Sequence, residues 1–206
     1  MSKNKISKNW LNKQKRDSFF KQSKIQGYRS RSAFKLIEIN DKYKFLKKNT
    51  NLLDLGSTPG GWSQVASKKI TKGKILAVDI NPMEEINNVN FIQGDLFTDK
   101  TIKDKVSLFF NGKIDVVMSD IAVNTSGNKD LDSFRTGDIC LQAMDLSLEL
   151  LHEDGVFLSK LFMGSIFMSI NEKAKKNFKK IVRYKPLSSK KESKEIYIYC
   201  KGLVKV

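Results

Sequence analysis

Four aspartates have the same kind of position in the sequence, because each lies within or just after a short apolar segment. They are Asp54, Asp79, Asp95 and Asp120. The glycine-rich turn 56–61 follows the first of them, and a helix is expected directly after that turn. In an open α/β sheet, a strand, a tight turn and a helix N-terminus form the usual site for a nucleotide-type cofactor. The aspartates would then form the rim of this site.

The spacing within the turn narrows the choice of cofactor. Gly56, Gly60 and Gly61 remove side chains where the backbone must turn tightly or a ligand must come close, and Pro59 suits the first turn of a helix. The spacing fits neither a dinucleotide fingerprint nor a phosphate-binding P-loop, and Asp54 would repel a pyrophosphate. A cofactor with a positive centre, an amino group and a ribose fits better, and S-adenosylmethionine is such a molecule. An ordinary turn without a ligand is the alternative.

Each of the other aspartates has an expected role at this rim. Asp79 lies about 20 residues beyond the turn, where a carboxylate accepts hydrogen bonds from a cofactor ribose. Asp95 could accept from an adenine amino group, and Asp120 precedes a long polar loop at a position typical of active sites. Their neighbours Ile80 and Leu96 are also expected to contact the cofactor. Taken singly, each aspartate could be a cap or turn residue.

Two lysines and a glutamate complete the set of residues that could take part in a reaction. Lys160 lies inside the apolar segment 156–162, and burying an ammonium without a partner is expensive. The alternative is an edge strand with Lys160 pointing to solvent. Lys35 lies on a predicted helix, where it would by itself be taken for a surface lysine, and Glu195 opens the last predicted strand.

The elements that must position these residues alternate between strand and helix. Strands are expected over 52–55, 74–80, 89–97, 113–124, 156–162, 181–186 and 195–202. Helices are expected over 30–46, 60–70, 98–110, 133–151 and 165–179. This order predicts an α/β fold with a mostly parallel sheet of these seven strands, helices on both faces and a closing hairpin-like pair. A single domain, 29–206, would follow a basic extension, 1–28.

The charge of the chain is high and uneven. The net charge is +16, with 15 basic and 3 acidic residues in 1–48, 12 and 2 in 173–206, and 11 and 17 between them. Basic ends of this kind suggest a polyanion partner, most simply RNA. Lys21, Lys24, Arg29 and Arg31 are the candidate phosphate contacts. A general lysine bias is the alternative, but it does not explain the acidic centre.

The remaining composition excludes some classes of protein. The two cysteines form no disulfide framework, and no metal-ligand spacing is present around the single histidine, His152, which lies near the end of a predicted helix. No apolar run is long enough for a membrane span. Trp10 and Phe19 could anchor a short N-terminal helix. The same basic N-terminus also resembles an organellar transit peptide, so a targeting role stays open.

Seven motifs resemble those of the FtsJ/RrmJ family of ribosomal RNA 2′-O-methyltransferases, in order, from about residue 10 to 202. They are GYRSRSAFKL, LDLGSTPGGWSQ, AVDINPM, FIQGDLF, VVMSDIAVNTSG, FLSKLF and SKEIYIYCKG. Within the family, NKDLDSFR and SSKKESKEIYIY look closer to the mitochondrial branch, which methylates a uridine ribose in large-subunit RNA. The loop after Asp120 departs from the family because it reads Ile-Ala-Val-Asn where Met-Ala-Pro-Asn is usual.

This resemblance implies a Rossmann-like seven-stranded fold with an antiparallel last strand, and S-adenosylmethionine as donor. It also implies a catalytic tetrad of Lys35, Asp120, Lys160 and Glu195. It further implies that the cofactor is bound by Gly60, Trp62, Asp79, Asp95 and Asp120. A lysine can act as a base near neutral pH only if its pKa falls from about 10.4, which burial and a second ammonium favour. We expect Lys160 to be the base, with Lys35 holding the hydroxyl, Asp120 orienting Lys160, and Glu195 positioning Lys35 or the substrate.

Other functions remain open on the sequence alone. A transfer RNA anticodon-loop methyltransferase shares the same core, and a ribosome-assembly protein could keep the fold without catalysis. A small-molecule methyltransferase is disfavoured by the basic ends, and a nicotinamide oxidoreductase by the turn spacing. We expect a monomer without membrane contact that acts on large-subunit ribosomal RNA. It would be intracellular, in the cytoplasm of a bacterium or in a mitochondrion or other organelle of a eukaryote.

Overall fold

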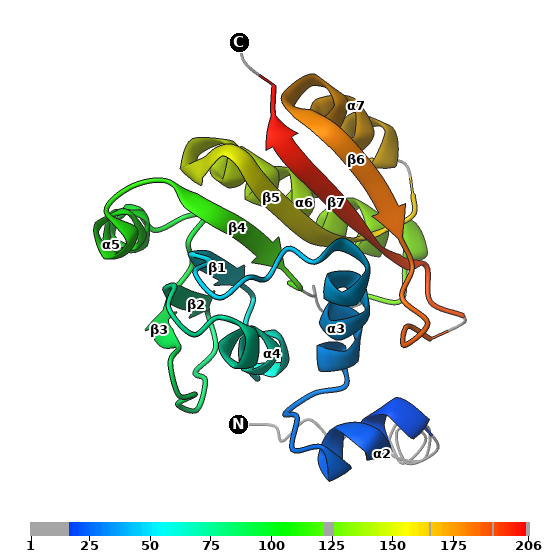
Figure 1. Cartoon of the computed structure of the whole chain (residues 1–206). Helices are drawn as coiled ribbons and strands as arrows, with labels where there is room; N and C mark the ends of the chain where they lie inside the picture. Colours follow the sequence, from blue (N-terminus) through cyan, green and yellow to red (C-terminus); the bar gives the residue numbers. More distant parts are fainter. Residues whose placement is uncertain (1–16, 122–125, 165, 191, 205–206) are drawn as a thin grey trace, which may run out of the picture.

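A seven-stranded sheet in the order β3-β2-β1-β4-β5-β7-β6 forms the centre of the computed structural model (Figure 1). The model describes residues 17–121, 126–164, 166–190 and 192–204. The strands are β1 (Leu52–Leu55), β2 (Ile75–Asp79), β3 (Asn90–Gln93), β4 (Ile114–Ser119), β5 (Leu151–Phe162), β6 (Phe178–Tyr184) and β7 (Glu195–Leu203). Strand β7 runs antiparallel to both of its neighbours, β5 and β6. The predicted fold class and the antiparallel last strand are therefore confirmed.

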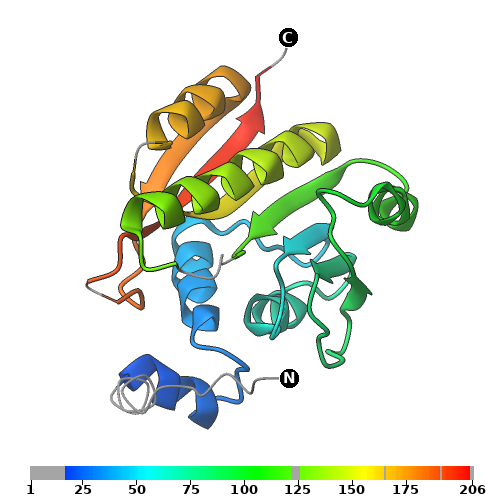
Figure 2. The same cartoon turned by 180° about the vertical axis from the view of Figure 1, so that it is seen from behind.

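Helices cover both faces of this sheet. They are α2 (Ser18–Ile25), α3 (Ser32–Tyr43), α4 (Gly61–Lys69), α5 (Lys100–Phe110), α6 (Lys129–Leu150) and α7 (Phe167–Asn177). Helices α3 and α4 pack on one face with an apolar cluster that includes Leu158 and Tyr197. Helices α5, α6 and α7 cover the other face, which is seen from behind in Figure 2. None of the described helices combines the length and apolarity needed to cross a membrane.

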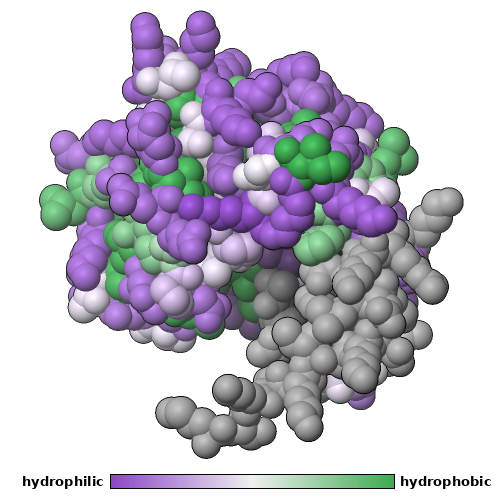
Figure 3. Space-filling model, turned by 90° about the horizontal axis from the view of Figure 1, so that it is seen from below, coloured by the Kyte–Doolittle hydropathy of each residue, from purple (hydrophilic) through white to green (hydrophobic). Residues whose placement is uncertain are grey.

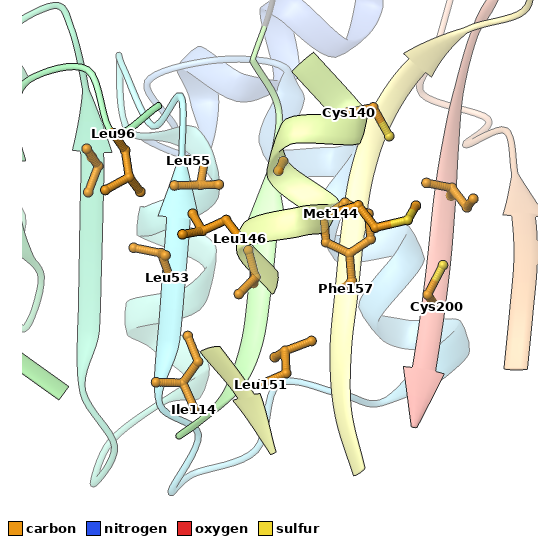
Figure 4. Packing of buried hydrophobic residues seen from close by; sticks show 14 of the residues in the cluster. Leu53, Leu55, Leu96, Ile114, Cys140, Met144, Leu146, Leu151, Phe157 and Cys200 are labelled. Carbon is orange, nitrogen blue, oxygen red and sulfur yellow. The ribbon is translucent and has the colours of Figure 1, made fainter. Parts of the chain in front are cut away.

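The core on the α6 face is formed by apolar residues from central strands and one long helix (Figure 4). Leu53 of β1 and Phe157 of β5 are fully buried there, together with Met144 of α6. Strands covered on both faces need apolar side chains on both, which explains why β1 and residues 156–162 of β5 are nearly continuous apolar runs. Asp54 and Lys160 interrupt these runs, so each needs a specific partner in the folded chain.

The strands predicted over 89–97 and 113–124 are shorter in the structure and cover 90–93 and 114–119. Three other predicted boundaries were wrong, each for a local reason. Helix α6 begins at Lys129 and not at 133, because the Asn128 side chain accepts from the backbone N–H groups of Asp130 and Leu131 and caps the helix. Strand β5 begins at Leu151, which pairs with β4 ahead of a register shift. His152 therefore lies on a strand. Strand β6 covers 178–184 and not 181–186, ending before Pro186, which has no N–H for the ladder.

The end of the basic extension packs on the domain through aromatic side chains. The Phe19 ring of α2 lies 5.6 Å from that of Phe34 on α3, and Tyr28 meets Phe34 edge-on at 5.7 Å. Asp17 caps α2 by accepting from the N–H of Phe20 and also pairs with the guanidinium of Arg31. The prediction for Trp10 lies outside the described residues.

Candidate active site

The four residues predicted as catalytic come together at the carboxyl ends of β4 and β5, where β7 begins. The Nζ of Lys160 lies 3.1 Å from Asp120 Oδ1 and donates to the Asp120 carbonyl at 2.7 Å. The Nζ of Lys35 on α3 lies 2.7 Å from each carboxylate oxygen of Glu195. Lys160 is buried but paired, so the alternative of an edge strand with this lysine in solvent does not apply.

Tyr197 joins the two ion pairs, and the sequence analysis did not single it out. It faces Lys160 across β5 and β7. Its hydroxyl donates to Asp120 Oδ1 at 2.9 Å, and its ring lies 5.8 Å from the Nζ of Lys35. Trp62 packs against the same ring at 5.6 Å. A fully buried tyrosine therefore sits between the two pairs and limits their movement.

Charges and burial fix the protonation of two members of this cluster. Burial works against the charged form of Asp120, but the ammonium groups of Lys160 and Lys35 and hydrogen bonds from Lys160 and Tyr197 leave its pKa below the ordinary value. Burial, followed by the charges of Asp120 and Glu195, raises the pKa of Tyr197 well above its ordinary value. Asp120 is thus an anion at neutral pH, and Tyr197 remains a hydrogen-bond donor.

Helix α3 also holds the segment that precedes β7. The Glu38 carboxylate accepts from the backbone N–H groups of Leu187 and Ser188, at 2.6 and 2.9 Å. The next residue, Ser189, donates to Glu195 Oε1 at 2.8 Å. One helix therefore carries Lys35 and also fixes the loop that orients the carboxylate with which Lys35 pairs.

A cavity of about 310 Å³ opens beside Asp120 at the carboxyl ends of β1, β2 and β3. It brings together six of the residues predicted to bind a cofactor, namely Gly56, Asp79, Ile80, Asp95, Leu96 and Asp120. Its apolar walls and carboxylate rim suit a ligand with a flat ring and several N–H or O–H donors. Thr58, Val78, Asn81, Phe97, Ile121 and Ile139 also line the cavity. No sequence pattern predicts these six residues.

The turn and the acidic rim are built by hydrogen bonds to the backbone. Asp79 accepts from the N–H groups of Thr58 and Asn81, and Asp95 accepts from that of Phe97. Gly56 has a φ of +70°, and a Cβ there would lie only 2.4 Å from a side-chain atom of Ile121. Glycine is therefore required at this position, because a side chain would be strained at this φ and would collide with Ile121.

Asp54 lies beneath the turn and is fully buried. Its Oδ2 accepts from Ser63 on α4 at 2.6 Å. Within the described part of the chain, its Oδ1 and the buried hydroxyl of Ser57 lack a hydrogen-bond partner. Unsatisfied buried polar atoms are uncommon. These two atoms therefore fit a turn that completes its hydrogen bonds when a polar cofactor is bound.

The other predicted cofactor residues lie in the turn but do not line the cavity. Pro59 precedes Gly60, which is the N-cap of α4, so this proline lies just outside the helix. Gly61 packs closely against Ser30. Trp62 is buried and donates through Nε1 to the carbonyl of Ser32. These residues join the turn to the start of α3.

The four predicted RNA contacts differ in how freely they reach solvent. Arg29 donates to the carbonyls of Pro59, Glu84 and Glu85, and Arg31 contacts Asp17 and the carbonyl of Ser188. Both guanidinium groups are therefore engaged within the protein. Lys21 and Lys24 on α2 are exposed. Their contacts with RNA stay predictions, as do those of the arginines.

The strand order and the site define a Rossmann-like methyltransferase. Residues 28–203 match the family described as FtsJ-like methyltransferase. The chain belongs to this family. A crystal structure assigned as a ribosomal RNA methyltransferase from Plasmodium falciparum superposes with a TM-score of 0.79 at 34% identity, covering 87% of this chain and all of the other.

Two bacterial relatives match almost the whole sequence. The Ribosomal RNA large subunit methyltransferase E of Pelagibacter ubique is 50% identical over 98% of this chain and all of its own length. The protein of the same name from Rickettsia akari is 41% identical over 93% of this chain and 87% of its own. A Streptococcus mutans methyltransferase fold in complex with SAH has a TM-score of 0.52 at 16% identity, covering 81% of this chain and 97% of the other, and shows likeness of fold alone.

Proposed function

We propose that this protein transfers a methyl group from S-adenosylmethionine to the 2′-hydroxyl of a ribose, in a uridine of large-subunit ribosomal RNA. The observation that carries the proposal is the pair of lysine–carboxylate contacts that meet at Tyr197 beside the aspartate-rimmed cavity. The names of the bacterial relatives support ribosomal RNA as the substrate. The reaction takes place where ribosomes are assembled, which in a bacterium is the cytoplasm.

The residues of the cavity fit the proposed cofactor. Asp79 and Asp95 offer acceptors for ribose hydroxyl and adenine amino groups, and Ile80 and Leu96 offer apolar surface for the ring. The unpaired oxygens of Asp54 and Ser57 can accept hydrogen bonds near the turn. When bound, this cofactor supplies a methyl group on a positively charged sulfur.

The chain itself then has to orient the hydroxyl and take its proton. Lys160 takes the proton as the neutral amine, after its own ammonium has released a proton to solvent. The ammonium formed in this way is stabilised by the Asp120 carboxylate and carbonyl that it already contacts. Lys35 is fixed by both oxygens of Glu195 and holds the hydroxyl from the α3 side. Tyr197 keeps Asp120 in place by donating to it.

The test is a transfer assay with methyl-labelled S-adenosylmethionine and large ribosomal subunits that lack the modification. The label is then mapped to ribose or base. Lys160→Ala should lower the transfer rate by about 10²- to 10⁴-fold, the usual contribution of a general base, while calorimetry still detects cofactor binding. The matched control is Lys176→Ala, an exposed lysine of α7, which should transfer normally.

Each outcome has a defined meaning. Label on one ribose that is lost in Lys160→Ala supports the proposal and identifies the nucleotide. Label on a base would contradict ribose methylation, and label on transfer RNA alone would move the protein to the anticodon-loop branch. Cofactor binding without any transfer would favour an assembly factor. An active Lys160→Ala variant would remove this lysine from the mechanism.

A further inference from the structure

A second cavity, of about 230 Å³, lies next to the tetrad at the carboxyl end of β5. Its lining residues are Asp132, Phe162, Glu192, Ser193 and Lys194. None of them belongs to the predicted tetrad or to the cofactor cavity. We name it the Phe162 cavity.

The register of β5 and β7 places this cavity beside the proposed base. Phe162 pairs with Glu195, and Lys160 pairs with Tyr197. Because residues two apart on a strand share a face, Phe162 lies on the same face as Lys160, roughly 7 Å further along. Lys160 therefore lies between the two cavities. Its partner Asp120 lines the cofactor cavity, and Phe162, two residues further along β5, lines the other.

The lining residues indicate what kind of group this cavity would take. Phe162 supplies a half-buried aromatic ring. Asp132 and Glu192 supply carboxylates, and hydrogen bonds from the backbone and side chain of Ser126 hold the pKa of Asp132 below its ordinary value. Lys194 adds one ammonium to the two carboxylates, so the lining keeps an excess of negative charge and suits an uncharged group better than a phosphate. A planar group with N–H donors would stack on the ring and donate to the carboxylates.

We propose that the Phe162 cavity binds the base of the nucleotide that is methylated, turned out of its stack. This inference rests on the proposed function. The base is attached to C1′ of the ribose and the reacting hydroxyl to C2′, so a hydroxyl at Lys160 leaves the base within reach of the neighbouring cavity. The volume is below the about 300 Å³ at which sites for drug-sized ligands begin. It therefore suits one base and not a length of RNA chain. Stacking on aromatic side chains is the usual way in which proteins hold such bases.

The test compares Phe162→Ala and Phe162→Tyr in the transfer assay. Stacking on an aromatic ring is worth about 1–3 kcal/mol per base. At about 1.4 kcal/mol per factor of ten, Phe162→Ala should lower kcat/KM for ribosomal subunits by about 5- to 140-fold. Phe162→Tyr keeps the ring and should recover most of this loss. Cofactor affinity should stay unchanged in both variants. The matched control is Phe134→Ala, since Phe134 is an exposed aromatic of α6 outside the cavity lining.

A second measurement does not depend on turnover. Ultraviolet cross-linking of the wild-type protein to ribosomal subunits, followed by mass spectrometry of the peptides, should place a nucleotide adduct on Phe162 or Ser193. Adducts confined to other peptides would overturn the proposal, as would normal kcat/KM in Phe162→Ala or an equal loss in Phe162→Tyr. Wild-type transfer is measured first. If the wild-type protein transfers nothing, the proposed function fails, and the cross-link still tests the cavity.

Discussion

Asp54 is a carboxyl group in the middle of a central strand, where an apolar residue would ordinarily be expected. It is fully buried, and one of its oxygens lacks a partner within the described residues. Burial, with a smaller contribution from the charges of Asp120 and Asp79, raises its pKa to about 7. The folded protein therefore holds a proton on Asp54 at pH values where the unfolded chain has released it. A residue that reduces stability in this way is consistent with a role in ligand binding.

This difference predicts how stability changes with pH. The unfolded pKa of an aspartate is about 3.9, so between about pH 4 and pH 7 the folded state binds the extra proton and stability falls as pH rises. The slope contributed by one group is about 1.4 kcal/mol per pH unit. Asp54→Asn should remove this contribution. In the cofactor-free protein, its stability relative to wild type should rise by about 2 kcal/mol from pH 5 to pH 7, because the slope decreases as the pH approaches the folded pKa. Urea unfolding at several pH values measures this.

The matched control for this measurement is Asp138→Asn. Asp138 is exposed on α6 and accepts from Gln142 one turn later. Its variant should follow the wild-type pH curve, because an exposed group contributes little to linkage. If the free energy of unfolding changed with pH in the same way in Asp54→Asn and in wild type, the folded state would not hold a proton on Asp54.

At the residue scale, the sequence predicts charged groups better than it predicts their partners. Lys160 stands out because an apolar strand rarely contains a lysine, and the structure gives it a partner in Asp120. Tyr197 could not be singled out, since an aromatic residue in a strand is usually core, and its hydroxyl meets Asp120 only through the β5–β7 register. The structural roles of Arg29 and Arg31 depend on loop carbonyls that have no sequence signature.

At the scale of elements, α3 determines the geometry on one side of the tetrad. The Glu38 carboxylate receives two backbone N–H groups from residues 187 and 188, and Ser189 continues from there to Glu195. A glutamine at position 38 has one acceptor oxygen, and its amide nitrogen would face the second N–H group. At least one hydrogen bond to a charged group, worth about 1.5–3 kcal/mol, would be lost.

Glu38→Gln should therefore lower kcat with little change in cofactor affinity. A displacement of about 1 Å at reacting groups can reduce the rate by up to about 100-fold, and we expect a loss within this limit. Single-turnover transfer together with calorimetric cofactor binding separates the two effects. Glu172→Gln on the exposed side of α7 serves as control. If kcat stayed normal in Glu38→Gln, the loop would hold Glu195 without help from α3.

The order of the helices and strands could be predicted from the sequence better than the residues at which they begin and end. Apolar runs and glycine turns indicate seven strands in the correct sequence, because buried parallel strands must be apolar on both faces. The ends depend on contacts between distant segments. Leu151 belongs to β5 only because it pairs with Ile114 of β4. The strand order β5-β7-β6 likewise depends on contacts between distant segments, because β7 pairs with β5 and leaves β6 at the edge of the sheet.

At the scale of the whole molecule, the linings of the two cavities differ in charge from the chain as a whole. Both cavities have carboxylates among their lining residues, although the net charge of the chain is +16. The face seen from below is mainly hydrophilic, with small separate apolar areas (Figure 3). Arg29 and Arg31 are engaged within the protein, whereas Lys21 and Lys24 of α2 are exposed. We therefore expect these lysines to make the phosphate contacts at this end of the molecule.

A salt titration tests this expectation. Each phosphate contact contributes about −0.7 to −0.9 to the slope of log affinity against log salt. The double variant Lys21→Ala with Lys24→Ala should therefore bind ribosomal RNA with a slope less steep by about 1.4 to 1.8. The control is Lys100→Ala with Lys103→Ala, an exposed pair on α5 at the opposite side of the molecule (Figure 1). Both double variants lose the same net charge, so a general field effect would change the two slopes equally. Only a shallower slope for the α2 pair assigns the contact to this helix, and equal slopes would place the RNA elsewhere.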